Sequence, residues 1–293
     1  MTPDHASKAY NTGISGLTIQ AMTIADPKIA AATAPLLVKR RGNIAIATLN
    51  RPAVRNALSE EMIAALTALL AELRDDAAVA ALVIAANGPA FCAGHDLKQL
   101  TSRRTDADGG KNYFRHIMTL CSAMMQAIVK LPKPVIACVQ GMASAAGCQL
   151  VATCDLAVAS AHARFATPGV DIGLFCSTPM VALSRNIAPK QAMEMLLTGE
   201  PVTAERALAI GLVNRVVADG RELDTALALA QTVASKSRRV VGIGKEAFYR
   251  QREMSLAQAY DYAAEVMTEN MMLQQSNEGI CAFLEKREPI WSE

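Results

Sequence analysis

Residues 135–149 read VIACVQGMASAAGCQ, a short apolar run followed by a turn of small residues. Residues 78–97 repeat this plan, with an apolar run to Ala86 and a small-residue turn at residues 93–95. A wholly apolar run of this length is typical of a strand that is covered on both faces. A third run follows at residues 155–159, and segments of helical periodicity separate the three. The sequence therefore predicts an α/β layered fold with parallel strand pairing.

The segments around these runs predict how the chain is organised. Residues 36–49 are rich in β-branched side chains and are interrupted at Gly42-Asn43, which predicts a hairpin. A helix is expected to begin at Ser59, and residues 101–111 are expected to form a mobile polar loop. Past residue 178 the pattern is mostly helical. The predicted parts are a flexible N-terminal extension (1–35), an α/β core (36–210) and a helical C-terminal part (211–293).

Composition excludes several classes of function. The 293 residues carry 29 Lys and Arg against 27 Asp and Glu, a formal charge of +2, which argues against nucleic-acid binding. No apolar run approaches the length of a membrane span, and residues 1–35 lack the pattern of a signal or transit peptide. Four histidines at no ligand spacing give no metal site, and no nucleotide-binding fingerprint is present.

The seven cysteines indicate a compartment. Their number is odd, their spacing is irregular, and several lie in apolar runs, where cysteine behaves as a small hydrophobic residue. We expect reduced thiols and a cytoplasmic location.

Both strand-to-turn junctions suit a ligand with a negatively charged oxygen. Small residues let a ligand approach the backbone closely. If a helix begins at Ala146, its first N–H groups lack internal partners and lie at the positive end of the helix dipole. The alternative is that these small residues serve packing alone.

These segments resemble the enoyl-CoA hydratase/isomerase (crotonase) superfamily. The similarity covers about residues 36–288 and rests on an ordered series of motifs. They are Leu49-Asn50-Arg51-Pro52, Arg55-Asn56-Ala57-Leu58, Phe91 to Leu97, Lys133 to Ala137, Gly141 to Gln149, Cys154-Asp155 and Gly279 to Arg287. Within the superfamily, residues 165–169 and 175–179 are most similar to the enoyl-CoA hydratase domain-containing protein 3 group.

The resemblance implies a crotonase (ClpP-like) fold of repeated ββα units with a C-terminal trimerisation region, assembled as a homotrimer or a hexamer. It implies an acyl-CoA thioester as ligand, with coenzyme A as part of the substrate and no tightly bound cofactor. The oxyanion-hole donors would be the backbone N–H groups of His95 and Ala146. Coenzyme A would run past a set of six residues and be reached by two more from a neighbouring subunit. The six are Arg55, Asn56, Ala57, Ala93, Asp96 and Lys98, and the two are Phe283 and Lys286.

The sequence departs from the family where protons are transferred. The two glutamates of the family's hydratases align with Gln149 and Gly169, neither of which can act as an acid or a base. Each such group contributes about 10²–10⁴-fold, so efficient hydration is not expected, whereas the backbone donors remain. Asp171 is the nearest alternative carboxylate and would share a face with residue 169 if the segment were extended.

Other polar side chains near the motifs have less direct expected roles. The ring of His95 is expected at the surface, with the pocket as the alternative. His116 is expected in the core or in a pocket wall, and Asp96 is expected to brace its turn. Two functions stay open: an enzyme of lyase or isomerase type that works through an enolate, or a catalytically weak acyl-CoA-binding or regulatory oligomer.

Overall fold

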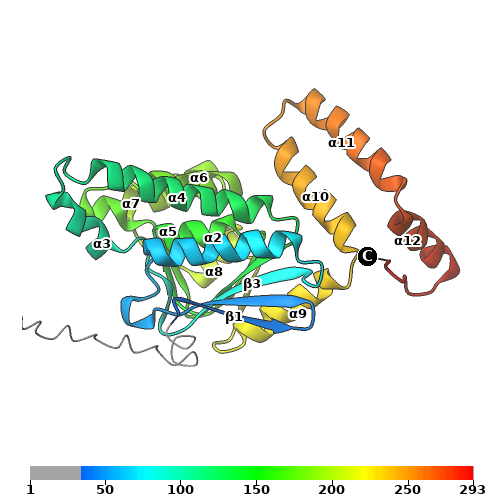
Figure 1. Cartoon of the computed structure of the whole chain (residues 1–293), viewed down its shortest axis with the longest axis horizontal. Helices are drawn as coiled ribbons and strands as arrows, with labels where there is room; N and C mark the ends of the chain where they lie inside the picture. The colour runs from blue at the N-terminus through cyan, green and yellow to red at the C-terminus, as the bar shows by residue number, and fades with distance from the viewer. Residues whose placement is uncertain (1–33, 293) are drawn as a thin grey trace, which may run out of the picture. The chain divides into compact units, whose positions relative to one another are not determined.

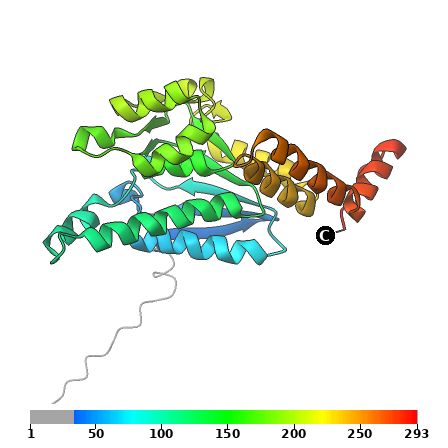
Figure 2. The same cartoon turned by 90° about the horizontal axis from the view of Figure 1, so that it is seen from above.

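The computed structural model describes residues 34–292 (Figures 1 and 2). The predicted N-terminal extension lies outside the described residues, except for Ala34 and Pro35. The strands are β1 (Leu36–Arg41), β2 (Ile44–Leu49), β3 (Ala81–Ala86), β4 (Ala90–Cys92), β5 (Val135–Val139), β6 (Met142–Ser144), β7 (Leu156–Ser160), β8 (Arg164–Ala166), β9 (Val202–Thr203) and β10 (Arg215–Val217).

Helices connect and follow these strands. The α-helices are α2 (Glu60–Asp75), α3 (Leu97–Ser102), α4 (Lys111–Lys130), α5 (Ala146–Thr153), α6 (Ser177–Asn186), α7 (Pro189–Thr198), α8 (Ala204–Ala209), α9 (Glu222–Ala234), α10 (Arg238–Gln251), α11 (Leu256–Met271) and α12 (Gln274–Glu285). The 3-10 helices are η1 (Pro52–Val54), η2 (Arg103–Thr105) and η3 (Pro168–Ile172).

Over residues 34–292 the strands form a six-stranded sheet, ordered β1-β2-β3-β5-β7-β10, and a four-stranded sheet, ordered β4-β6-β8-β9. Strands β1 and β2 are the predicted antiparallel hairpin, with Gly42 at φ 59° in its turn. The pairs from β2 through β3, β5 and β7 to β10 are all parallel. Three successive strand pairs divide between the sheets: β3, β5 and β7 lie in the six-stranded sheet, and β4, β6 and β8 lie in the four-stranded sheet. Helix α5 follows β6. The predicted crotonase fold is confirmed.

The apolar runs form strands because both of their faces are covered. In β3, alternate residues Ala81, Val83 and Ala85 pack with α9, whereas Leu82 and Ile84 lie in the larger cluster that includes α2 and α4. Figure 1 shows α9 on the opposite side of the strands from α2 and α4. Side chains alternate between faces along a strand, so each residue of this run needs to be apolar.

Two predicted boundaries differ from the structure. The sheet continues past residue 210, because β10 pairs with β7 and α9 packs against β3, β5 and β7. The helical remainder therefore begins with α10. The expected polar loop at 101–111 is partly helical, since α3 and η2 extend through Thr105. Asp96 caps α3 by accepting a hydrogen bond from the Gln99 N–H at 3.2 Å.

Candidate active site

The two small-residue turns lie against one another. A Cβ atom on Gly147 would lie 2.1 Å from the carbonyl oxygen of Cys92, so only glycine lets α5 pack this closely on β4. A Cβ atom on Gly94 would lie 3.2 Å from the backbone nitrogen of Ala146. Gly94 has φ 91°, which also favours glycine. These contacts place the turn before α3 beside the N-terminus of α5.

The backbone N–H groups of His95 and Ala146 have no acceptor among residues 34–292. Leu58 N–H donates to the Gly94 carbonyl at 2.7 Å, and Asp96 N–H donates to the Leu58 carbonyl at 3.2 Å. These bonds flank His95 in a parallel bridge, so its own N–H points away from Leu58. Ala146 is the first residue of α5, where an N–H has no partner within the helix. The structure thus presents two unused donors at adjoining turns.

Ala145, which precedes α5, has a strained backbone. Its φ of 49° and ψ of −117° lie outside the left-handed helical region that non-glycine residues occasionally adopt. Two hydrogen bonds hold it: its N–H donates to the Ala166 carbonyl at 2.9 Å, and its carbonyl accepts from Gln149 N–H at 3.0 Å. Strain of this kind gathers at functional sites, where the surrounding structure enforces it.

The segment predicted to follow coenzyme A runs beside the first turn. Ala93 N–H donates to the Arg55 carbonyl at 3.0 Å, which brings residues 55–57 alongside β4. Arg55 and Lys98 are exposed and form no ion pair with any residue from 34 to 292, so both are free to meet an anionic ligand. Asp96 is already engaged, because the Arg51 guanidinium lies 3.3 Å from its Oδ2. Asp96 therefore braces the turn, as expected.

Asn56 is a structural brace and not a side-chain ligand contact. Its side chain is fully buried, and Nδ2 donates to the carbonyls of Asn87 at 2.8 Å and Ala90 at 2.9 Å. Its Oδ1 accepts from Arg51 N–H at 2.8 Å. Every polar atom of the side chain is thus occupied, and only the backbone remains for a ligand.

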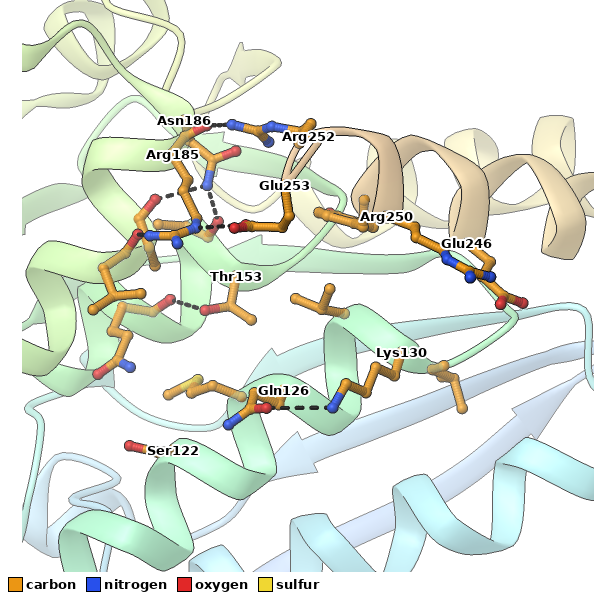
Figure 3. A pocket seen from close by; sticks show the side chains of 18 of the residues that line it. Ser122, Gln126, Lys130, Thr153, Arg185, Asn186, Glu246, Arg250, Arg252 and Glu253 are labelled. Carbon is orange, nitrogen blue, oxygen red and sulfur yellow. Dashed lines mark hydrogen bonds and ion pairs between the residues drawn. The ribbon is translucent and has the colours of Figure 1, made fainter. Parts of the chain in front are cut away.

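Gln149 lies one turn along α5 from Ala146 and is 4% exposed. Its Oε1 is buried and accepts no hydrogen bond from the described part of the chain. A buried, unpaired amide oxygen is costly, which indicates a place where a ligand or water donates. Gln149 also lines the pocket shown in Figure 3.

Gly169 leaves no room for a carboxylate. A Cβ atom there would lie 2.7 Å from the Leu174 carbonyl oxygen and 2.9 Å from the Cys176 sulfur. The loop before α6 therefore fills the space that a side chain would enter. Burial raises the pKa of the Cys176 thiol, so this thiol is not a nucleophilic thiolate at neutral pH.

The expectation that Asp171 shares a face with Gly169 is wrong. Residues 168–172 form η3, and in a 3-10 helix positions two apart point in different directions. Asp171 is exposed, and its carboxylate lies beside Gly199, the residue that follows α7. A Cβ atom built on Gly199 would lie 3.2 Å from each of the two Asp171 carboxylate oxygens. The Asp171 carboxylate therefore lies beside the end of α7 and does not share a face with Gly169.

The two histidines also differ from expectation. Both ring nitrogens of His95 are buried and have no hydrogen-bond partner within residues 34–292, so this ring is not a surface group. Burial lowers the pKa of His95, and the nearby Leu58 carbonyl offsets part of this effect. His116 is exposed and lies 3.0 Å from the Glu60 carboxylate, outside the core.

Phe283 and Lys286 are not brought to the turns within one chain. Phe283 lies in the last turn of α12 and Lys286 directly after it, and α12 follows α11 in the chain (Figure 1). The Phe283 side chain is 82% exposed. A contribution from these residues to a coenzyme A site needs a second subunit, as the family resemblance implies.

Sequence reasoning missed the anchor that holds α10 on the core. Lys245 Nζ donates to Asp155 Oδ2 at 2.6 Å and to the carbonyls of Ile128 and Lys133 at 2.9 Å. Tyr249 donates to Asp155 Oδ1 at 2.9 Å. Burial lowers the pKa of Lys245, partly offset by Asp155. Lys245 and Asp155 are 90 residues apart, and the available signal was an aspartate at the start of an apolar run.

The anchored α10 forms one wall of a pocket of about 930 Å³, with α4, α5 and α6 on its other sides (Figure 3). On α5 it is lined by Gln149, Ala152 and Thr153, which share one helix face. In the described part of the chain no helix is long and apolar enough to cross a membrane, and no group of three potential ligands could hold a metal ion.

Solved structures and curated proteins similar to this chain agree with the fold. An enoyl-CoA hydratase from Mycobacterium smegmatis is 50% identical, with a TM-score of 0.83 over 88% of this chain and 98% of that one. The structure of human enoyl-CoA hydratase domain-containing protein 3 is 43% identical, with a TM-score of 0.83 over 88% and 100% of the two chains. The mitochondrial protein of this name from Danio rerio is 46% identical over 87% of each chain. The resemblance to this group is confirmed.

The predicted cytoplasmic location is contradicted by these relatives. The proteins from Homo sapiens, Danio rerio and Rattus norvegicus all carry the word mitochondrial in their names. The prediction rested on unpaired cysteines, which distinguish a reducing compartment from an oxidising one. They do not separate one reducing compartment from another.

Residues 39–293 match the enoyl-CoA hydratase/isomerase family, which is most of the chain and includes both turns. The chain therefore belongs to the enoyl-CoA hydratase/isomerase family.

Proposed function

We propose that this chain binds an acyl-CoA thioester and stabilises its enolate between the N–H groups of His95 and Ala146. The observation that carries the proposal is that these two donors adjoin and have no acceptor within residues 34–292. When carbon dioxide leaves the α-carbon of a malonyl-type thioester, the electron pair of the broken carbon–carbon bond passes to the carbonyl oxygen, so an enolate forms without a protein base. Fixed N–H groups aimed at this oxygen lower the energy of that state. Arg55 and Lys98, both exposed beside the first turn, supply positive charge for the phosphates of coenzyme A.

Gln149 acts on the acyl group without transferring protons. Its free Oε1 accepts a hydrogen bond from a water or from a substrate hydroxyl one helical turn beyond Ala146. An amide is neither an acid nor a base at neutral pH. Hydration is therefore slow, and reactions that need only a polarised thioester are favoured.

A second candidate is a catalytically weak acyl-CoA-binding or regulatory oligomer. The packing at Gly169 favours it, because the Leu174 carbonyl and the Cys176 sulfur fill the space of the second acid. Under this alternative the donors bind the thioester, and no proton transfer follows.

Substitution at Ala146 tests the donor role. Proline has no N–H and is accepted at the first position of a helix, so Ala146→Pro removes one donor, whereas Ala146→Ser keeps it. We expect Ala146→Pro to weaken turnover of enoyl-, β-keto- or malonyl-type thioesters by about 10²–10³-fold, and Ala146→Ser to remain near wild type. Thermal unfolding checks that both variants are folded.

The outcomes separate the candidates. Turnover that depends on the Ala146 N–H supports the enolate enzyme. Tight binding of every thioester without turnover supports the weak binding protein. Failure to bind any CoA ester overturns both.

A further inference from the structure

The pocket between α4, α5, α6 and α10 is not needed for thioester activation, since neither His95 nor Ala146 is among its lining residues. Its volume of about 930 Å³ falls within the range of small-molecule sites. Apolar side chains line much of it, among them Met125, Val129, Leu131 and Val181. The buried Gln149 amide, with its unpaired Oε1, lies in its lining. An apolar cavity with an unsatisfied buried polar atom indicates a ligand site.

The pocket carries excess positive charge. Its lining holds five cationic residues and two acidic ones. Arg185 is paired with Glu253 at 3.5 Å. The other four form no ion pair with a residue between 34 and 292: Arg74, Lys130, Arg250 and Arg252. In Figure 3, Lys130 comes from α4, Arg250 from α10 and Arg252 from the position directly after α10, with Thr153 of α5 between these helices.

We propose that this pocket binds the far end of an acyl chain that carries a terminal carboxylate, so that the preferred thioesters are those of long dicarboxylic acids. The inference rests on the proposed function, because the chain must start at the oxyanion donors. The methylene groups pass Gln149 and lie on the apolar wall. The carboxylate reaches the cations that form no ion pair, where charge-assisted hydrogen bonds favour it over a methyl group.

The length of α5 sets the length of the acyl chain that the pocket accepts. From Ala146 to Thr153 the helix rises by about 10 Å, the length of roughly eight extended carbon–carbon bonds. A chain of about ten to twelve carbons therefore spans the distance from the donors past Thr153. A six-carbon diacid ends beside the apolar wall, where its carboxylate loses water and gains no partner.

Calorimetric binding of matched thioesters tests the proposal without relying on turnover. Dodecanedioyl-CoA is compared with dodecanoyl-CoA, and hexanedioyl-CoA with hexanoyl-CoA. We expect the twelve-carbon diacid to bind about tenfold more tightly than its monoacid, with the preference falling as salt is added. We expect the six-carbon pair to show no preference for the diacid.

Two double variants locate the effect. Lys130→Gln with Arg250→Gln removes two pocket charges, and we expect it to abolish most of the diacid preference while dodecanoyl-CoA binds as before. Lys190→Gln with Arg206→Gln removes two positive charges outside the pocket and should leave the preference intact.

An equal or tighter affinity for dodecanoyl-CoA in the wild type overturns this inference and leaves the proposed function standing. A diacid preference that survives the pocket variant also overturns it. If no CoA ester binds, the proposed function itself fails.

Discussion

Ala145 holds a backbone conformation that glycine adopts at little cost. Its φ of 49° and ψ of −117° cost about 1–3 kcal/mol for a residue with a side chain. We expect Ala145→Gly to raise the free energy of unfolding by about 1 kcal/mol, after the greater flexibility of glycine in the unfolded chain is subtracted. Urea unfolding measures it. Ala152→Gly, inside α5, is the matched control and should lower stability by about 1 kcal/mol. Destabilisation by both variants contradicts the assigned strain.

Gln149 is the position where an acid can be introduced without crowding, because glutamate has almost the same shape. Burial raises the pKa of the introduced carboxyl above its ordinary value of about 4.3. The folded state of Gln149→Glu then holds a proton that the unfolded state releases. Its stability relative to wild type is therefore highest at low pH and falls as the pH rises through the raised pKa.

Urea unfolding at pH 5 and pH 8 checks this sign. Because the unfolded carboxyl is already mostly ionised at pH 5, a difference of about 1.4 kcal/mol corresponds to each unit by which the folded pKa exceeds 5. We expect the same variant to hydrate crotonyl-CoA about 10²-fold faster than wild type. If Gln149→Glu differs from wild type in free energy of unfolding by the same amount at both pH values, the side chain is not in a buried, unpaired position.

At the scale of elements, the close packing of α5 on β4 positions the donors. Gly147→Ala brings a methyl carbon to the Cys92 carbonyl, which lies 2.1 Å from the ideal Cβ position, so helix and strand must separate. We expect a loss of about 1–3 kcal/mol in unfolding free energy, together with weaker thioester binding as Ala146 moves away from Gly94. Gly244→Ala on α10 is the control, since nothing lies within 4 Å of its added carbon.

Gly244→Ala should be neutral or stabilise the protein by about 0.5–1 kcal/mol, as alanine does in a helix. Both variants are compared by urea unfolding and by calorimetry with one CoA ester. Unchanged binding by a folded Gly147→Ala variant contradicts the idea that this contact sets the donor geometry.

Local pattern predicted the elements well because the physical causes are local. The run in β3 is apolar at every position because each of its faces is covered, and Ser59 caps α2 by accepting a hydrogen bond from Met62 N–H at 3.3 Å. The close approach at Gly147 was also predicted. The sequence left open whether its partner is a ligand or another part of the chain, and the structure shows that it is the Cys92 carbonyl.

The features that sequence did not predict depend on residues far apart in the chain or on an unexpected local conformation. Gly169 excludes a side chain because the chain returns at residues 174–176, and Asp171 turns away because its segment is a 3-10 helix. Lys245 reaches Asp155 across 90 positions of sequence. Periodicity carries no information about such contacts.

At the scale of the whole molecule, α11 and α12 lack a core within one chain. No residue of α11 is buried, and its exposed apolar side chains include Leu256 and Tyr260, more than 70% exposed, and Met267. Phe283 and Leu284 on α12 are similarly exposed. An apolar surface of this kind marks an interface, and a helix of 16 residues is marginal without packing. We therefore expect copies of this chain to associate through these helices, as a trimer or a pair of trimers.

Light scattering after size exclusion measures this assembly directly. Leu256→Glu with Met267→Glu places charges on the apolar surface of α11 and should yield monomers, with less helical signal in circular dichroism. Glu265→Gln, on the same helix, should leave the assembly intact. Because Phe283 and Lys286 lie outside the site of their own chain, the monomeric variant should also bind coenzyme A esters more weakly. A wild-type chain that is monomeric at micromolar concentration, or a monomeric variant with full affinity, contradicts a site completed by a neighbouring subunit.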